Sequence, residues 1–114
     1  MQISSYRFGK IEIDGQTCTS DVIVTPERVI STWWRKEGHS LAVPDLAEIM
    51  AAQPEVLVVG TGYYGRMDVP EATRRYLQTH GVQLREARTG DAVNEFNRLQ
   101  QEYARVVAAL HLTC

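Results

Sequence analysis

The sequence predicts a single α/β domain that begins with a β-hairpin and continues with strands joined by helices. Three observations predict this class. Apolar and polar residues alternate over Tyr6–Ile13, an uninterrupted apolar run covers Val56–Val59, and helical patterns begin near Val69 and Thr89. The 114 residues are enough for one hydrophobic core but not for two, so we expect residues 1–114 to form one domain.

The first third of the chain is expected to be β-structure. The alternating stretch Tyr6–Ile13 is typical of a strand, and Asp14-Gly15 is typical of a hairpin turn at its end. Two or three further short strands are expected between Cys18 and Trp34, where β-branched and aromatic residues gather.

Helices and strands are expected to alternate in the rest of the chain. Residues 44–53 have the spacing of a helix with a narrow apolar face, and a proline ends it. Val56–Val59 is predicted to be the central strand, because an apolar run of this length indicates burial on both faces. Asp68 is expected to cap a helix over about Val69–His80, which Gly81 ends.

The last third repeats this pattern. A strand is expected over Val82–Ala87, and Thr89 is expected to cap a helix that reaches Leu99. The tail from Arg105 to Cys114 suits either more helix or a buried strand. A strand is favoured, because one helix through the tail would be about twice the mean length. Strands joined by helical crossovers usually lie parallel.

Charge and composition exclude several classes of protein. Twelve Lys and Arg against fourteen Asp and Glu give a net charge of −2 without a basic stripe, which argues against nucleic-acid binding. The apolar runs are too short to span a bilayer, so no membrane insertion is expected. Residues 1–7 lack the apolar core of a secretory signal, and Cys18 and Cys114 have no paired spacing, so we expect a cytoplasmic protein with two reduced thiols.

A glycine motif follows the apolar run. Gly60–Gly65 has the GxGxxG spacing of dinucleotide-binding turns, and Glu86 lies where a ribose-binding acid would be. The next helix is expected to begin only beyond Asp68, however, and no second nucleotide-binding half follows. The motif therefore predicts chiefly a glycine-rich turn that leaves a buried strand.

The same turn remains a candidate ligand site, because open α/β sheets bind ligands at the carboxyl ends of parallel strands. Gly60, Thr61, Gly62 and Arg66 are the predicted residues for a small anionic ligand or a nucleotide. In the alternative interpretation, Arg66 is solvated or pairs with Asp68.

Trp33–His39 is the most unusual local sequence, because it combines two indoles, two cations and an imidazole. One indole is expected in the core. The other could stack on Arg35, line a pocket or form a subunit contact, since Trp and Arg are enriched in interfaces. Trp34, Arg35 and His39 are therefore the predicted interaction surface.

Catalytic and metal motifs are absent from the sequence. His39, His80 and His111 fall in three different segments without metal-ligand spacing, so neither a metal nor a cofactor is predicted. The one catalytic arrangement to consider is Cys114 as nucleophile with His111 or His39 as base. Enzyme activity is thus not the leading hypothesis.

Several strings taken together, in this order and at this spacing, identify a resemblance. They are Trp34-Arg35 with Gly38-His39, Val58–Gly62, Tyr76-Leu77 with His80–Val82, Thr89 with Ala92-Val93, Phe96-Asn97 with Leu99, and His111–Cys114. The chain resembles the small Mth-type domain family of unknown function, which includes mitochondrial respiratory complex I assembly factor 3 and the adipogenesis-associated Mth domain-containing protein. The resemblance implies a three-layer α/β domain with a mixed, mostly parallel central sheet whose last strand is antiparallel.

The resemblance also implies a function. Family members have no agreed catalytic activity, and the eukaryotic relatives act through protein partners. The leading hypothesis is therefore a non-catalytic protein-binding or assembly module. The alternative is an enzyme or sensor that binds a small anion or nucleotide at the Gly60–Arg66 loop. A third hypothesis is a homo-oligomer whose exposed aromatic side chains pair its subunits.

Overall fold

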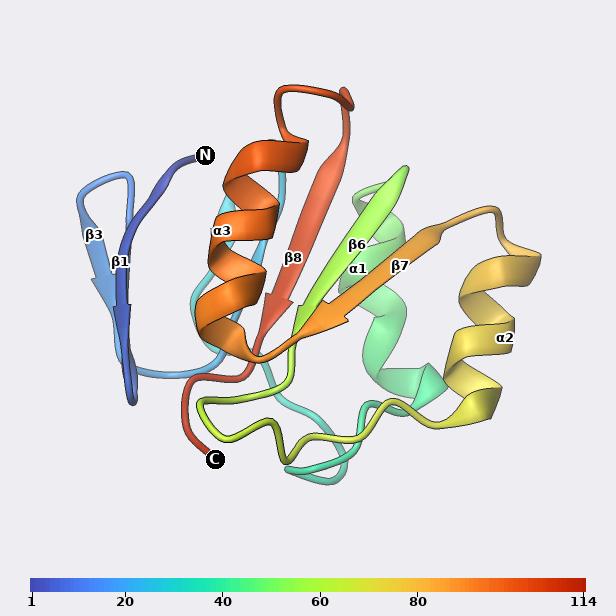
Figure 1. Cartoon of the computed structure of the whole chain (residues 1–114). Coiled ribbons are helices and arrows are strands. Elements are labelled where there is room, and N and C mark those ends of the chain that lie inside the picture. The colour runs from blue at the N-terminus through green and yellow to red at the C-terminus, as the bar shows by residue number, and fades with distance from the viewer.

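A small antiparallel sheet precedes a larger mixed sheet in the computed structural model, which describes all residues 1–114 (Figure 1). The small sheet contains β1 (Ile3–Arg7), β2 (Lys10–Ile13) and β3 (Gln16–Cys18). The predicted turn at Asp14-Gly15 is confirmed. The prediction of one strand over Tyr6–Ile13 is wrong, because the chain reverses at Gly9, whose φ of +75° favours glycine.

The large sheet has the strand order β5-β4-β8-β6-β7. Its strands are β4 (Val22–Val24), β5 (Val29–Ile30), β6 (Val56–Gly60), β7 (Gln83–Ala87) and β8 (Val106–Leu110). The mixed sheet and the strand in the tail are confirmed. β8 occupies the middle position, so the prediction that Val56–Val59 forms the central strand is wrong by one place.

The last strand, β8, is antiparallel to only one of its two neighbours. β8 runs antiparallel to β4 but parallel to β6, which is itself parallel to β7. The helix between β7 and β8 carries the chain back across the sheet, so β8 enters in the same direction as β6 and β7. The antiparallel strand implied by the resemblance therefore describes only the pairing with β4.

Helices cover both faces of the large sheet. A 3-10 turn (Val43–Leu46) leads into α1 (Ala47–Ala51), and α2 (Glu71–Thr79) follows β6. α3 (Thr89–Leu99) lies in front of the sheet in Figure 1, and α1 lies behind it. None of the helices combines the length and the apolar character that a membrane crossing requires.

Two predicted helix caps are wrong. α2 begins after Pro70 rather than at Asp68, and α3 begins after Arg88 rather than Thr89. The backbone of Asp68 pairs with another loop instead: its N–H donates to His39 O (2.8 Å) and its carbonyl accepts from Leu41 N (2.9 Å). Asp68 thus joins two loops instead of starting a helix.

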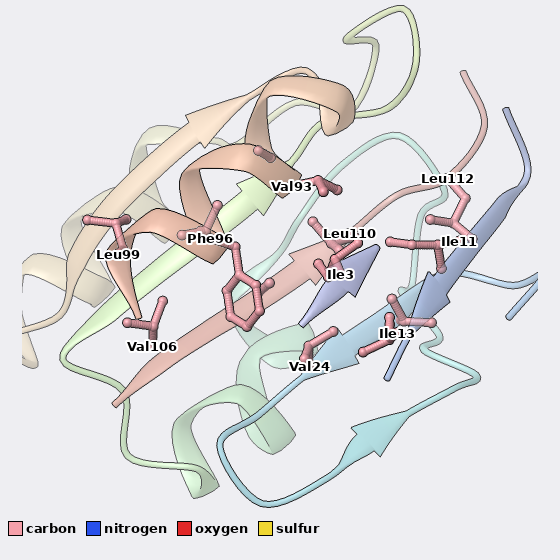
Figure 2. Packing of buried hydrophobic residues seen from close by; sticks show 14 of the residues in the cluster. Ile3, Ile11, Ile13, Val24, Val93, Phe96, Leu99, Val106, Leu110 and Leu112 are labelled. Carbon is pink, nitrogen blue, oxygen red and sulfur yellow. The ribbon is translucent and has the colours of Figure 1, made fainter. Parts of the chain in front are cut away.

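β6 is buried on both faces, as its apolar run predicts. Val56 and Val58 face α3 and the small sheet, whereas Leu57 and Val59 face the side of α1 and α2. Figure 2 shows the first of these clusters, with the ring of Phe96 pointing from α3 toward the sheet. The domain therefore has three layers, with the large sheet in the middle.

Truncation of Phe96 tests this core. Phe96 is fully buried, so Phe96→Ala should lower the free energy of unfolding by about 3–5 kcal/mol, measured by equilibrium urea unfolding. Asn94→Ala, on the exposed side of α3, is the matched control and should change stability by less than about 0.5 kcal/mol. Equal effects of the two substitutions would contradict the packing of α3 on the sheet.

Candidate functional site

The parallel strands β6, β7 and β8 end together at one edge of the large sheet. Gly60 is in register with Ala87 of β7 and with Leu110 of β8. The loop after β6 and the segment after β8 therefore begin side by side, and Figure 1 shows the C-terminal segment passing next to the β6 loop. This edge is where open α/β sheets bind ligands.

The backbone N–H groups of the glycine-rich loop already have partners within the chain. Tyr63 N donates to Thr113 O (2.7 Å) and Arg66 N donates to Cys114 O (3.0 Å). Gly62 N donates to the hydroxyl of Thr89 at 2.9 Å. A phosphate could not use these groups without displacing the chain's own oxygens.

Two glycines of the loop allow other segments of the protein to approach its backbone closely. A Cβ on Gly60 would lie 2.8 Å from Thr89 Oγ1, and a Cβ on Gly62 would lie 2.5 Å from the carbonyl carbon of Cys114. Gly62 also has a φ of +109°, which L side chains rarely adopt. The first two glycines of the motif are therefore explained by close packing, of Gly60 against Thr89 and of Gly62 against the C-terminal segment.

The side chains around the loop leave a cavity of about 380 Å³, lined by Thr61, Gly65, Arg74 and Arg88 among others. Arg66 is exposed and makes no ion pair with Asp68, so of the two alternatives to ligand binding the structure agrees with a solvated Arg66. Arg74 pairs with Glu86 across the cavity. Of the residues predicted for an anion, Thr61 lines this cavity, whereas Gly60, Gly62 and Arg66 do not. The cations at the cavity are Arg74 and Arg88 instead.

A second group of polar residues centres on the carboxylate of Asp21, between β3 and β4. Its Oδ2 accepts hydrogen bonds from Arg35 Nη2 (2.8 Å) and His111 Nδ1 (2.7 Å). Its Oδ1 accepts a hydrogen bond from the backbone N–H of Leu112 (2.8 Å). We call Asp21, Arg35 and His111 the Asp21 cluster.

The Asp21 cluster is largely removed from water. The side chains of Arg35, His111 and Asp21 are 4%, 7% and 17% exposed. Burial alone would raise the pKa of Asp21, but the hydrogen bonds from His111, Leu112 and Arg35 outweigh it and hold the pKa below its ordinary value. Asp21 is therefore an ionised carboxylate at neutral pH.

Hydrogen bonding fixes the tautomer of His111. An ionised carboxylate can only accept, so we assign a proton to Nδ1 of His111. Nε2 is buried and has no hydrogen-bond partner, and the same is true of Arg35 Nε and Nη1. The ring of His39 lies edge-on to that of His111, with centroids 5.7 Å apart.

The predicted interaction surface is only partly at the surface. Trp34 is 83% exposed and His39 is exposed. Arg35 is buried instead, because Asp21 and the carbonyl of Gly38 (2.7 Å) hold its guanidinium inside. The cation stacks on the buried indole of Trp33, 4.6 Å from the ring centroid, and not on Trp34.

The two predicted sites do not merge into one cavity, because the pocket beside Trp34 and the cavity at the glycine-rich loop share no lining residue. His111 contacts the Asp21 cluster, whereas Thr113 and Cys114 hold the glycine-rich loop. Cys114 and Cys18 are both free thiols, and no group of His, Cys, Asp and Glu side chains lies at metal-ligating distance.

Sequence reasoning missed Asp21 and an aromatic patch. Asp21 is a lone acid directly before the buried strand β4, and that position was the one signal of its role. Phe8, Tyr63 and Tyr64 are about half exposed and contact one another, with ring centroids 5.1–6.2 Å apart. These three residues come from two distant turns, which no local pattern could join.

Fold and site together define a small mixed α/β domain with a buried, carboxylate-centred polar cluster at the carboxyl edge of its sheet. The chain belongs to the family described as protein of unknown function (DUF498/DUF598), whose model matches residues 3–111.

Solved structures show the same fold. A Bordetella parapertussis protein matches with a TM-score of 0.82 and 28% identity, over 97% of this chain and 94% of that one. The conserved hypothetical protein PH1505 from Pyrococcus horikoshii OT3 matches with a TM-score of 0.80 and 25% identity over all of both chains. A Bordetella pertussis protein described as a Mth938-like domain has a TM-score of 0.71 and 24% identity over 97% of this chain and 85% of that one. The resemblance to the Mth-type family is thus confirmed.

The pKa of Asp21 predicts a pH-dependent stability. A carboxyl whose pKa is lower in the folded state stabilises the fold above its ordinary pKa of about 3.9, and this contribution is lost as pH falls through the folded pKa. Asp21→Asn should cost about 3 kcal/mol or more at pH 7, because it leaves Arg35 without its counter-ion. The difference in unfolding free energy between wild type and Asp21→Asn should become smaller below about pH 4, measured by urea unfolding at a series of pH values. A difference that does not change with pH would contradict the lowered pKa of Asp21.

Gly62→Ala tests the packing of the C-terminal segment. The substitution combines an unfavourable φ with a clash against Cys114 and should cost more than about 3 kcal/mol in unfolding free energy. Gly81→Ala is the matched control, because its φ is +74° but its Cβ would meet nothing within 4 Å. The control should cost about 1–2 kcal/mol, and equal costs would show that the clash is absent.

Proposed function

We propose that this protein is a non-catalytic binding module that docks a protein partner on the surface formed by Trp34 and His39. The observation that carries the proposal is the 83% exposure of Trp34, next to a Trp33 that is 7% exposed. Indoles at the centre of interfaces supply large contact areas and dominate binding energies. An exposed indole of this kind fits a partner better than a core.

The residues on either side of Trp34 support this proposal. Trp33 packs in the core with Leu41 and Met67, and Arg35 is tied to Asp21. The backbone of Trp34 is therefore fixed from both sides while its side chain points outward. A fixed backbone lowers the conformational entropy lost when a partner orders the indole, so affinity rises without further contacts.

We extend the proposal to an assembly role in the cytoplasm, of the kind that the resemblance to complex I assembly factor 3 implies. The exposed aromatic patch of Phe8, Tyr63 and Tyr64 offers a second contact area at the same end of the molecule as the C-terminal segment. A module with two aromatic surfaces suits a protein that holds other chains.

A second candidate function is binding of a small anion or nucleotide at the Gly60–Arg66 loop, by an enzyme or a sensor. The observation that favours it is the cavity at the carboxyl ends of β6 and β7, in which Arg88 has no carboxylate partner. Inorganic phosphate should then raise the thermal midpoint of the wild type and have no effect on Arg88→Gln. An equal response of the two proteins would exclude this site.

Partner capture tests the docking surface. Immobilised wild type and Trp34→Ala should retain different sets of proteins, because the substitution removes the exposed indole and leaves the fold intact. Phe8→Ala is the matched control, since it removes an aromatic ring of the other patch, and it should retain the Trp34-dependent partner. Binding of a purified partner should weaken by about 2 kcal/mol or more in Trp34→Ala.

Identical partner sets for wild type and Trp34→Ala, with unchanged unfolding curves, would contradict docking at Trp34. Light scattering at high protein concentration separates it from self-association. A dimer that Trp34→Ala dissolves would identify the partner as a second copy of the chain.

A further inference from the structure

We propose that the free edge of β7 docks an extended segment of a partner protein, which adds a strand to the large sheet and directs a lysine or arginine side chain toward α3. β7 is the last strand in the order β5-β4-β8-β6-β7, so it has a neighbour on one side only (Figure 1). Every residue of β6 and β8 is buried, whereas every residue of β7 is exposed or half-buried. This edge includes neither Trp34 nor His39, so the inference does not depend on the docking surface proposed above.

The first step is the hydrogen-bond pattern of β7. In a parallel pair, alternate residues of a strand bond to its neighbour. Gln83 N donates to the carbonyl that precedes β6 (3.0 Å), and Ala87 O accepts from the N–H that follows β6 (2.9 Å), so Gln83, Arg85 and Ala87 direct their backbone groups toward β6. The N–H and C=O groups of Leu84 and Glu86 therefore point away from the sheet, where no group of this chain pairs with them. Four backbone groups are thus free to bond a further strand.

The second step is that this edge lacks the protection given to another edge of the protein. At β1, the side-chain amide of Asn97 accepts from Ile3 N (3.1 Å) and donates to Ile3 O (2.8 Å). Charged side chains often protect edges, but those of β7 are held on its two faces. Arg85 donates to Glu95 of α3 (2.8 Å), and Glu86 pairs with an arginine of α2. Their charges are thereby neutralised and do not repel a strand at the edge.

The third step is a pocket of about 310 Å³ between β7 and α3. Its apolar lining consists of Val58, Ala87 and Ala92, and its charged lining consists of Arg85, Glu86, Asp91 and Glu95. Three carboxylates and one guanidinium leave the pocket negative, and Asp91 alone among the three acids makes no ion pair. A side chain with an apolar stem and a cationic end matches this lining, as lysine and arginine do.

The alternation of side chains along a strand decides which residue of the docked segment reaches this pocket. Arg85 is in register with Val58, which faces α3, so a residue opposite Arg85 in an added strand also faces α3. In an antiparallel pair, the more stable arrangement, its two neighbours bond to Leu84 and Glu86. The lysine or arginine of the partner belongs at the position opposite Arg85.

A second copy of this chain fits the edge less well. The antiparallel register that uses all four free groups pairs Leu84 of each copy with Glu86 of the other, and it places Arg85 opposite Arg85. Like charges directly opposite each other destabilise a sheet. The docked strand is therefore assigned to a different protein, with one basic residue among neutral residues that favour strands.

The probe is the peptide acetyl-Ser-Thr-Val-Thr-Lys-Thr-Val-Thr-Ser-amide, and the readout is the backbone N–H resonances of Leu84 and Glu86 in a nitrogen–proton NMR titration. Both resonances should shift saturably and both protons should exchange more slowly with water, because they gain carbonyl acceptors. The same peptide with glutamate in place of lysine should bind about tenfold more weakly or worse. No saturable shift, or a shift that leaves the exchange of Leu84 and Glu86 unchanged, would overturn the proposal.

Methylation of backbone nitrogens in the peptide tests the strand addition itself. Alternate N–H groups of a strand point to the same side, so a peptide methylated at the two threonines beside the lysine loses its donors toward β7 and should not bind. A peptide methylated at the lysine and the two valines keeps those donors and should bind. Equal binding of the two methylated peptides would show that the contact is not a strand addition.

Two variants test the pocket and its charge. Asp91→Asn removes the acid without an ion pair and should weaken binding of the lysine peptide by about tenfold while leaving that of the glutamate peptide no weaker. Glu48→Gln is the matched control, because it removes an exposed acid of α1 outside this pocket and should leave the titration unchanged. Equal effects of the two variants would contradict the contact with Asp91.

A pair of substitutions at one position tests the edge from the side of the protein. Glu86→Pro and Glu86→Gln remove the same carboxylate, but only proline removes the outward N–H, which the ladder with β6 does not use. The proline variant should lose binding and the glutamine variant should keep it. Should Glu86→Pro fail to fold, the methylated peptides still decide. A dimer at high concentration that Glu86→Pro dissolves would instead assign the edge to a second copy and overturn the proposal of a different partner.

Discussion

The structure at the carboxyl edge of the large sheet depends on the hydrogen bonds that the carboxylate of Asp21 accepts. This carboxylate accepts hydrogen bonds from three groups in two distant parts of the chain: the guanidinium of Arg35, and the ring of His111 and the backbone N–H of Leu112, which both follow β8. One charge thereby ties the β3–β4 connection to residues some 90 positions away. Removal of that charge would leave the guanidinium of Arg35 buried and unpaired, so the buried position of Arg35 depends on Asp21.

The C-terminal segment transmits this constraint to the rest of the carboxyl edge. Leu112 is held on its N–H by Asp21 and on its carbonyl by the hydroxyl of Tyr6 (2.8 Å). Burial of that hydroxyl raises the pKa of Tyr6 to about 12, so the hydroxyl keeps its proton and remains a donor at neutral pH. With Leu112 fixed, the carbonyls of Thr113 and Cys114 meet the N–H groups of the glycine-rich loop.

Local patterns predicted most of the elements, because strands and helices depend on residues close in sequence. The apolar run at Val56–Val59 and the helical spacing before Gly81 are examples. Strand order and the role of the Gly60–Gly65 motif were not predictable in this way. Both depend on which distant segment packs alongside, and the alternation over Tyr6–Ile13 continues through a turn without any change of period.

Prediction of the candidate site was less complete for the same reason. The unusual string Trp33–His39 was recognised, and Trp34 is exposed as an interaction surface requires. The burial of Arg35 followed from its pairing with Asp21, a single acid in a segment without a motif. Ion pairs across the fold have no signature in one sequence, because either partner alone resembles an ordinary surface charge.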